Sequence, residues 1–248
     1  MPTFEQLVAE GESVPTDGWD FSWFAGRATE QRPGWGYAAL LADRMSRASA
    51  AADLQTGGGE VVATAPRVPR QFATETWPPN AALACRRLPG ALVVQVAEHS
   101  PLPFRTASLD LVTSRHPTYT PWPEITRVLR PGGTVLTQQI GHGTNRELSE
   151  FFLGPLPPPR STVYDRRRTL GDLDVHTLTE ATCRVEFFDV AAVIHFLRKV
   201  IWTVPDFTVA RHHDRLRAMH DHITEHGSFL SHSRRVLVEA RKPLSTAP

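Results

Sequence analysis

A glycine-rich turn after a short apolar run is the part of this sequence whose residue types and spacing best suit ligand binding. Three alanines precede Asp53, and the turn 53–60 contains three consecutive glycines before Glu60. Consecutive glycines that join a short strand to a helix are where an open α/β sheet holds a nucleotide-like ligand. We therefore expect such a site at this turn. The residues expected to bind there are Asp53, Gln55, Thr56, Gly57 and Gly59.

The residues that the turn lacks indicate which nucleotide-like ligand it takes. Val62 stands where a dinucleotide-binding fingerprint has its third glycine, and Glu60 is expected in the first turn of the following helix. A carboxylate at a helix N-terminus opposes a bound pyrophosphate. A ligand that carries an adenosine, no phosphate and a positive charge meets no such conflict. S-adenosylmethionine fits that description.

The turn 53–60 resembles the first motif of class I S-adenosylmethionine-dependent methyltransferases, D-x-G-x-G-x-G, with Gln55 in place of the first glycine. Further matches follow in the expected order at Ala73-Thr74-Glu75, Leu102-Pro103-Phe104, Leu109-Asp110-Leu111-Val112, Glu124-Ile125 and Val128-Leu129-Arg130-Pro131-Gly132-Gly133. The chain is similar to the ubiquinone-biosynthesis-like (methyltransferase type 11) branch over roughly its middle half. The resemblance implies an α/β, Rossmann-like, doubly wound fold. Its mainly parallel seven-stranded sheet would have an antiparallel last strand and a helical cap, and its cofactor would be S-adenosyl-L-methionine.

Four further residues are expected to contact the cofactor. Glu75 ends the second strand, where its carboxylate can accept both ribose hydroxyl hydrogens; the alternative is a surface glutamate that caps the next helix. Thr76 and Trp77 are expected beside the adenine, although Trp77 equally suits the core. By resemblance, Glu98 matches the acidic position that reads the adenine amino group, and its alternative is a solvated loop residue.

Gln55 is the main departure from the family pattern, and it allows two interpretations. If the missing glycine served a positive φ or a close approach, Gln55 strains the turn or intrudes on the site. If the backbone is ordinary, the glutamine amide can bond the amino-acid part of the cofactor. We favour the second interpretation, because Gly57 and Gly59 remain to allow the close approach.

The strand end 113–117 is the best candidate for the reacting end of the site. In the fold that the chain resembles, this edge faces the methionine part of the cofactor, so Ser114 is expected to bind it. His116, with an ordinary pKa near ~6.5, is the candidate catalytic base if the acceptor arrives protonated. Arg115 is expected to hold an acidic substrate group or the cofactor carboxylate. An equally simple alternative is that His116 is a turn residue whose ring is hydrogen-bonded by the backbone.

The remaining histidines and arginines suggest less specific chemistry. His222 and His226 have the i, i+4 spacing of shared metal ligands, but no glutamate follows His222 as in H-E-x-x-H, so a wet helix face is preferred and no metal is expected. His195 lies on an apolar helix and either points into a substrate pocket or is a satisfied core histidine. The run 166–168 of three arginines is most simply a solvated face, with RNA contact as the alternative.

Short β-type runs alternate with helical patterns from residue 50 onward, which favours a mainly parallel sheet. The strands are expected at 50–54, 71–75, 92–97, 109–114 and 134–140, with an irregular sixth strand at 173–176 and 184–187 and a last strand at 236–240. The helix that begins near Pro123 should stop at 131–133. A helix capped by Asp189 and a second capped by Thr208 should roof the substrate side.

One domain spans 1–248 in this interpretation. Residues 1–48 form an aromatic and helical cover, 49–188 the cofactor core, 189–228 the helical cap and 229–248 the last strand and tail. Trp19 in the cover and Trp202 in the cap are expected to bind substrate, together with Arg115 and His195. The prolines at 155 and 157–159 predict an extended loop.

Composition limits the possible partners. A formal charge of +1 over 248 residues removes the broad electrostatic case for nucleic acid. Two cysteines cannot make a disulfide framework, the first residues do not read as a signal peptide, and no apolar run could span a bilayer, so we expect a cytoplasmic protein. We expect a monomer or homodimer that methylates a small molecule. The alternatives are an RNA or protein methyltransferase and a non-catalytic protein of the same fold.

Overall fold

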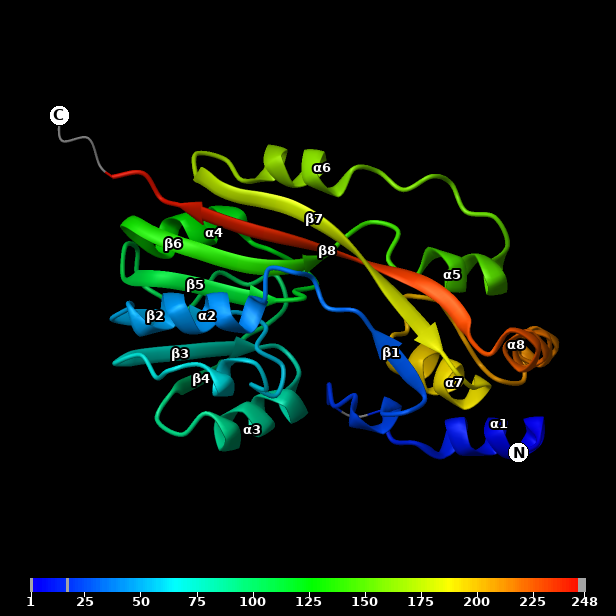
Figure 1. The fold of residues 1–248 in the computed structure, drawn as a ribbon. Coiled ribbons are helices and arrows are strands. Elements are labelled where there is room, and N and C mark those ends of the chain that lie inside the picture. The colour runs from blue at the N-terminus through cyan, green and yellow to red at the C-terminus, as the bar shows by residue number, and fades with distance from the viewer. Residues whose placement is uncertain (1, 17, 245–248) are drawn as a thin grey trace. The chain divides into compact units, whose positions relative to one another are not determined.

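The computed structural model describes residues 2–16 and 18–244, in which eight strands form one sheet in the order β1-β7-β8-β6-β5-β2-β3-β4 (Figure 1). The chain divides into two compact units. The first unit comprises the described part of Met1–Pro33 with His142–Arg160 and Thr182–Arg234, and the second comprises Gly34–Gly141, Ser161–Ala181 and the described part of Arg235–Pro248. Strands β7 (Asp174–Phe187) and β8 (Phe229–Arg241) contribute residues to both units.

Parallel strands form the centre of the second unit, as the sequence predicts. They are β2 (Ala50–Asp53), β3 (Arg70–Glu75), β4 (Leu92–Gln95), β5 (Leu109–Arg115) and β6 (Leu129–Ile140). The pairs β2·β3, β2·β5, β3·β4 and β5·β6 are all parallel. The end of β8 pairs with β6 in antiparallel register, from Thr134 opposite Arg241 to Ile140 opposite Arg235. The predicted mainly parallel sheet with an antiparallel last strand is therefore confirmed.

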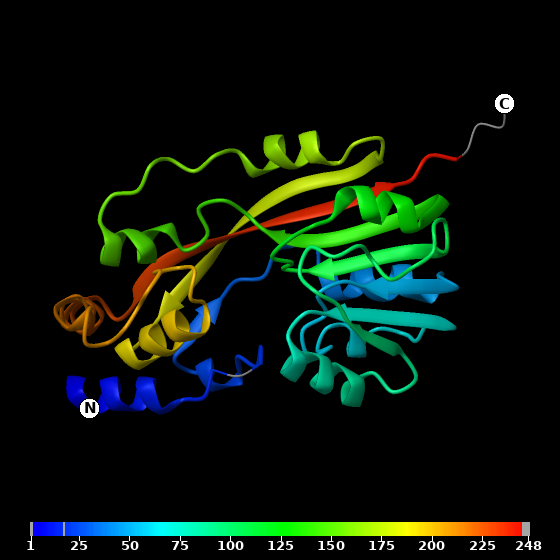
Figure 2. The same ribbon diagram turned by 180° about the vertical axis from the view of Figure 1, so that it is seen from behind.

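Helices cover both faces of this sheet, which explains why its central strands are apolar on both sides. Helices α2 (Tyr37–Ser46) and α3 (Pro78–Arg87) pack with Leu111 and Leu136 on one face, and α4 (Trp122–Val128) packs with Val112 and Val135 on the other. Figure 1 shows α2 crossing in front of the strands, and α4 lies toward the viewer when the molecule is seen from behind in Figure 2. The fold class expected from the sequence is thus observed.

The expected helix after the glycine-rich turn is absent from the described residues, and this corrects the sequence analysis. Only a 3₁₀ turn, η2 (Val62–Thr64), follows the glycines. Pro66 disfavours helical backbone at the residue before it, and Pro69 lies one residue ahead of β3, so the segment has no room for a longer helix. Glu60 instead pairs with Arg87 at 2.5 Å. The helix-dipole argument against a pyrophosphate therefore does not apply to this turn.

The structure also corrects three element boundaries. The described sheet has eight strands rather than seven, because β1 (Ala28–Glu30) adds to β7. Strand β7 is itself one strand of 14 residues, whereas the sequence analysis expected two pieces. Helix α4 ends at Val128, and β6 begins at Leu129 and runs through the Pro-Gly-Gly that was expected to stop the helix. Helix α8 (His213–His226) begins after His212 rather than after Thr208.

The first unit is built mainly from helices. It contains α1 (Phe4–Ser13), η1 (Ser22–Phe24), α5 (Arg146–Leu153), α7 (Val190–Lys199) and α8, while α6 (Thr162–Thr169) belongs to the second unit. Asp189 caps α7 as predicted, since its carboxylate accepts from Ala192 N at 2.7 Å. Helix α1 packs so closely on α7 that a Cβ at Gly11 would lie only 2.8 Å from the Ala191 carbonyl oxygen. This unit collects most of the predicted cover and all of the predicted helical cap.

Candidate functional site

The glycine-rich turn leaves the carboxyl end of β2 and is tied to the neighbouring strand β3. Thr56 N donates to the Thr74 carbonyl at 2.9 Å, which fixes the middle of the turn beside that strand. Gly57 and Gly59 have φ of +62° and +78°, a region that favours glycine. A Cβ at Gly59 would also lie 3.0 Å from Leu88 Cγ. The turn therefore requires glycine at these two positions, as the sequence motif implies.

Glu75 is the polar centre of this turn. Its side chain is only 6% exposed, and one carboxylate oxygen accepts from Gly57 N at 2.7 Å. The other oxygen accepts from the backbone N–H groups of Thr76 at 2.8 Å and Trp77 at 3.1 Å and from the Thr76 hydroxyl at 3.4 Å. Each carboxylate oxygen has about two acceptor sites, so one site remains for a ligand hydroxyl, on the oxygen that accepts from Gly57 N. Glu75 thus organises the turn in addition to offering an acceptor at the end of β3.

Asp53, at the end of β2, is a buried carboxyl group with an altered acidity. Burial raises the pKa of Asp53 to about 6, the neighbouring Glu75 also raises it, and a 2.6 Å hydrogen bond from Thr113 Oγ1 partly opposes the shift. A cation placed beside this group would favour its ionised form. Asp53 and Glu75 together make an acidic site that suits a cationic ligand with ribose hydroxyls.

Gln55 has the backbone conformation that the missing glycine would adopt. Its φ is +52°, so the interpretation that assumed an ordinary backbone is wrong on that point. Its amide is also engaged: Nε2 donates to the Tyr119 carbonyl at 2.5 Å, and Oε1 accepts from Thr118 N at 2.8 Å and Thr118 Oγ1 at 2.9 Å. Gln55 therefore fastens the segment after β5 to the glycine-rich turn.

We expect Gln55→Gly to be more stable than Gln55→Ala by about 1 kcal/mol, because both variants lose the bonds to Thr118 and Tyr119 but only alanine keeps the left-handed strain. Chemical denaturation of the two variants measures this difference. Equal stability, or a more stable alanine variant, would show that the positive φ at Gln55 carries no cost.

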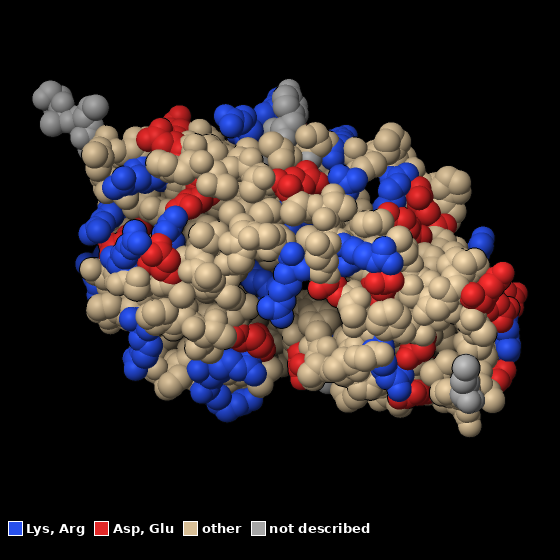
Figure 3. Space-filling view, in the orientation of Figure 1, with Lys and Arg blue, Asp and Glu red and all other residues tan. Residues whose placement is uncertain are grey.

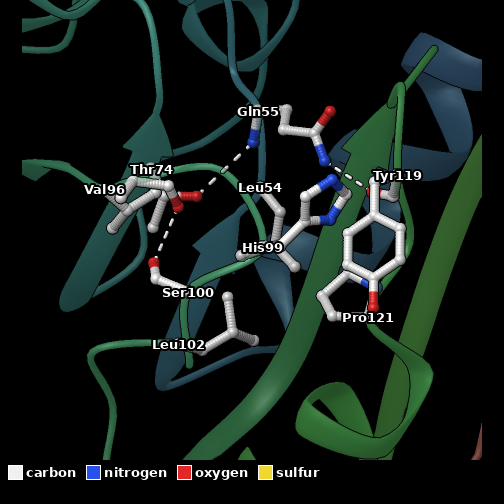
Figure 4. A pocket seen from close by; sticks show the side chains of 10 residues that line it. Leu54, Gln55, Thr74, Val96, His99, Ser100, Leu102, Tyr119 and Pro121 are labelled. Atoms are coloured by element: carbon white, nitrogen blue, oxygen red, sulfur yellow. Dashed lines mark hydrogen bonds between the residues drawn. The ribbon is translucent and has the colours of Figure 1, made fainter.

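A pocket opens beside Gln55 at the carboxyl ends of β2, β3 and β4 (Figure 4). The space between its lining side chains is partly open to solvent. His99 packs edge-on against Tyr119 with ring centroids 4.5 Å apart. The lining residues are Leu54, Gln55, Thr74, Val96, Ala97, His99, Ser100, Leu102, Tyr119 and Pro121. These residues give the pocket both polar and apolar lining side chains.

Three other predicted cofactor residues lie in different surroundings. Trp77 is exposed and its backbone N–H is held by Glu75, so its ring is not part of the core. Glu98 is exposed beside His99 and does not line the pocket. Ser114 is buried in β5, where its hydroxyl bonds Thr137 Oγ1 at 2.7 Å and its carbonyl accepts from Tyr37 Oη at 2.9 Å. Their predicted contacts with the cofactor stay predictions.

His116 follows β5 and is held by Gln138, whose own amide is oriented by Trp35. Trp35 Nε1, which can only donate, lies 2.8 Å from Gln138 Oε1, so the Gln138 amide nitrogen must donate to His116 Nε2 at 2.9 Å. Nε2 is therefore the unprotonated nitrogen of the ring. Burial lowers the pKa of His116 to about 2, and the positive charges of Arg115 and Arg235 lower it further.

This geometry makes His116 a weak base, so we expect kcat at saturating S-adenosylmethionine to show no inflection near pH 6.5. We expect His116→Gln to keep kcat within about threefold, since positioning supplies most of the rate in methyl transfer from an activated carbon. The pH dependence of kcat in both proteins measures this. A fall in kcat below pH 6.5 that disappears in the variant would establish His116 as the base.

The predicted substrate residues of the first unit belong to a cluster of rings. His195 is 1% exposed, stacks on Phe24 at 5.0 Å and meets Trp23 edge-on at 5.0 Å. Its Nδ1 has no hydrogen-bond partner among the described residues. Burial lowers the pKa of His195 to about 4, and Lys199 and Arg198 contribute. Trp19 and Trp202 lie 6.0 Å apart at the exposed side of the cluster.

Several residues of these sites carried no usable signal in the sequence. Tyr119 and His99 lie in loops without motif, and the contact of Trp35 with Gln138 joins residues 103 positions apart. Hydrogen bonds over such separations follow from strand pairing and leave no local pattern. The Pro117 turn beside Thr118 was visible, but nothing in it indicated the bonds to Gln55.

Residues 52–137 match the family model described as "Methyltransferase domain". A comparison with curated proteins gave no match. A Bacillus halodurans protein described, without an established activity, as a methyltransferase has a similar structure: TM-score 0.57, 18% identity, 83% of this chain and 98% of that chain covered. A Deinococcus radiodurans protein of unknown function is also similar, with a TM-score of 0.57 and 16% identity; 87% of this chain and 90% of that chain are covered. A Haloferax volcanii protein in complex with the Trm112 methyltransferase activator has a TM-score of 0.50 and 17% identity, with 99% of this chain and 98% of that chain covered.

Proposed function

Residues 52–137 match a methyltransferase domain, and from this premise we propose that the protein is a class I S-adenosylmethionine-dependent methyltransferase that transfers the cofactor's methyl group to a small-molecule acceptor. The observation that carries the proposal is the buried Glu75 carboxylate, which holds Gly57 of the glycine-rich turn and keeps acceptor capacity at the end of β3. The raised pKa of Asp53 supports it, because a nearby cation compensates for burying a carboxylate.

In this proposal the second unit binds the cofactor through its own side chains. Glu75 accepts a ribose hydroxyl, Asp53 faces the positive charge, and the pocket beside Gln55 takes the adenine. The predicted contacts of Thr56, Thr76, Trp77, Glu98 and Ser114 belong to the same proposal. When bound, S-adenosylmethionine supplies a methyl carbon that is already activated for displacement. The chain's task is then to align the acceptor and exclude water, and a base is needed only for a protonated acceptor.

A small acceptor is favoured over a polymer by the distribution of charge. On the face shown in Figure 3, Lys and Arg are interspersed with Asp and Glu, and the described residues form no continuous basic band there. The formal charge of the chain is +1, whereas nucleic-acid binding relies on a clear positive excess. Arg115 of the second unit is a proposed substrate residue, and the predicted substrate contacts of Trp19, His195 and Trp202 in the first unit stay predictions. Among the described helices, none has the length and apolar character that a membrane crossing requires.

The proposal is tested in two steps. Isothermal titration with S-adenosylmethionine and S-adenosylhomocysteine measures cofactor binding, and release of S-adenosylhomocysteine from a panel of small acceptors measures turnover. We expect cofactor dissociation constants in the range of about 1–100 μM and turnover with at least one compact acceptor. Absence of binding at roughly 1 mM cofactor would contradict the proposal and favour a non-catalytic protein of this fold. Turnover with RNA or protein acceptors only would contradict the small-molecule acceptor but would leave the methyltransferase activity in place.

A further inference from the structure

The segment that joins β5 to α4 is anchored within the second unit by two glutamine side chains. Gln55 holds it from the glycine-rich turn, through its bonds to Thr118 and Tyr119. Gln139 of β6, which is 1% exposed, holds it from the sheet, because its Nε2 donates to Thr120 Oγ1 at 3.0 Å. The segment is therefore fixed at three successive residues.

The Gln55 amide bonds this segment as a neighbouring strand would. Its oxygen accepts from the backbone N–H of Thr118, and its nitrogen donates to the backbone carbonyl of Tyr119. The family motif has glycine at this position, and a glycine has no side chain that could make either bond. The anchoring contact therefore belongs to this chain and is not a property of the motif.

The backbone that Gln55 holds carries one ring of the pocket. Tyr119 and His99 both line the pocket, and their rings meet edge-on at 75° with centroids 4.5 Å apart (Figure 4). Two rings at such an angle form a corner, in which a flat ligand ring can stack on one ring and meet the other edge-on. The position of the Tyr119 ring follows from its backbone, and Gln55 bonds that backbone directly.

The backbone conformation of the pocket points to a ligand site independently of its rings. Gln55 and His99 both line the pocket, and their φ angles are +52° and +58°, in the region that favours glycine. Strained residues of this kind persist only where the surrounding contacts hold them, and they concentrate at binding and catalytic sites. The bonds from Gln55 to Thr118 and Tyr119 are contacts of that kind.

We propose that Gln55 is a positioning residue for the base of the bound nucleoside and that it acts through Tyr119. The glutamine itself contacts no part of the ligand; it holds the Tyr119 backbone so that the ring lies where a flat base can stack on it. This inference rests on the proposed function and assigns a role to the residue that departs from the motif.

Calorimetry on the full chain with two ligands tests the inference: S-adenosylhomocysteine, and 5′-methylthioadenosine, which has the same nucleoside but no amino-acid part. We expect Gln55→Gly to weaken both ligands by the same factor of at least about threefold. Tyr119→Ala should weaken both by about tenfold, because the stacking of one base on an aromatic ring is worth about that much. Tyr119→Phe keeps the ring and is the matched control, so both affinities should stay within about twofold.

The double variant Gln55→Gly/Tyr119→Ala shows whether the glutamine acts through the ring. We expect it to bind both ligands no more weakly than Tyr119→Ala alone, since without the ring the glutamine has nothing to position. A general loosening of the glycine-rich turn would instead add its own loss to that of Tyr119→Ala.

Four results would overturn the inference. If Gln55→Gly weakens S-adenosylhomocysteine but not 5′-methylthioadenosine, the glutamine binds the amino-acid part directly. If both affinities stay the same or rise in Gln55→Gly, the glutamine does not position the base. If Tyr119→Ala binds both ligands normally, the base does not stack on this ring. If the single losses add in the double variant, Gln55 acts independently of Tyr119.

The natural protein separates this inference from the proposed function. If it binds S-adenosylhomocysteine and the variants give one of these four results, only the inference fails. If it binds neither ligand, the proposed function fails first.

Discussion

Glu75→Ala should reduce the affinity for S-adenosylmethionine by at least about tenfold, since a charge-assisted hydrogen bond to a ribose hydroxyl is worth about 1.5 kcal/mol or more. The loss has a second cause in the protein itself. Without the carboxylate, the N–H groups of Gly57, Thr76 and Trp77 lose their acceptor, so the glycine-rich turn loses its support. We expect both effects in one variant, measured by calorimetry for binding and by denaturant unfolding for stability.

Glu60→Ala provides the matched control for this experiment. Glu60 belongs to the same turn and has a similar charge, but its carboxylate is bonded outward to Arg87 at 2.5 Å. A surface ion pair of this kind contributes at most about 1 kcal/mol, so cofactor affinity should stay within about threefold. If Glu60→Ala and Glu75→Ala weaken cofactor binding equally, the loss comes from the reduced negative charge of the turn and not from a specific contact between Glu75 and the ribose. If Glu75→Ala binds normally, its ribose role is wrong.

Asp53→Asn should stabilise the ligand-free protein by up to about 3 kcal/mol near pH 7.5 and by only about 0.5 kcal/mol near pH 4. The folded pKa of Asp53 is about 6, against an ordinary value of 3.8. A group whose folded pKa is raised contributes stability that is fully present below the unfolded pKa and is lost as the pH rises through the folded pKa. Asparagine keeps an oxygen for the Thr113 hydroxyl and carries no charge to bury.

The same substitution should have the opposite effect on cofactor affinity. A cation beside Asp53 binds the ionised carboxylate better, so the affinity of the natural protein for the cofactor should rise by up to about tenfold between pH 5 and pH 7.5. Asp53→Asn should show a flat profile at the lower affinity. The difference between the two proteins at each pH removes the pH dependence that they share, including that of other acids whose pKa is lowered, such as Glu124 and Glu147. A natural protein with pH-independent affinity would exclude a cation at Asp53.

The sheet and the acidic site could be predicted because their signals are local. The alanines before Asp53, the β-type run that ends at Glu75 and the apolar run of β5 each fix a strand and its carboxyl end. Parallel strands bring those ends to one edge. The role of Glu75 as the acceptor for three backbone N–H groups was not visible, because it depends on how the turn folds back on β3.

Other features failed for identifiable physical reasons. Strand β1 has three residues and no alternating pattern, so only its pairing with β7 defines it. The missing helix after the glycines could have been predicted from Pro66 and Pro69, which the motif outweighed. The prediction that His116 is a catalytic base assumed an imidazole with an ordinary pKa. Its burial and the amide of Gln138 are long-range properties that a turn sequence does not show.

The central claim is that S-adenosylmethionine binds at the glycine-rich turn with its ribose on Glu75. A crystal structure with S-adenosylhomocysteine tests it most directly. We expect a ribose hydroxyl within about 3.2 Å of the Glu75 carboxylate oxygen that accepts from Gly57 N, and the adenine in the pocket lined by Val96, His99 and Tyr119. Ligand bound away from Glu75, or a turn that stays closed by Gln55 at saturating ligand, would contradict the claim.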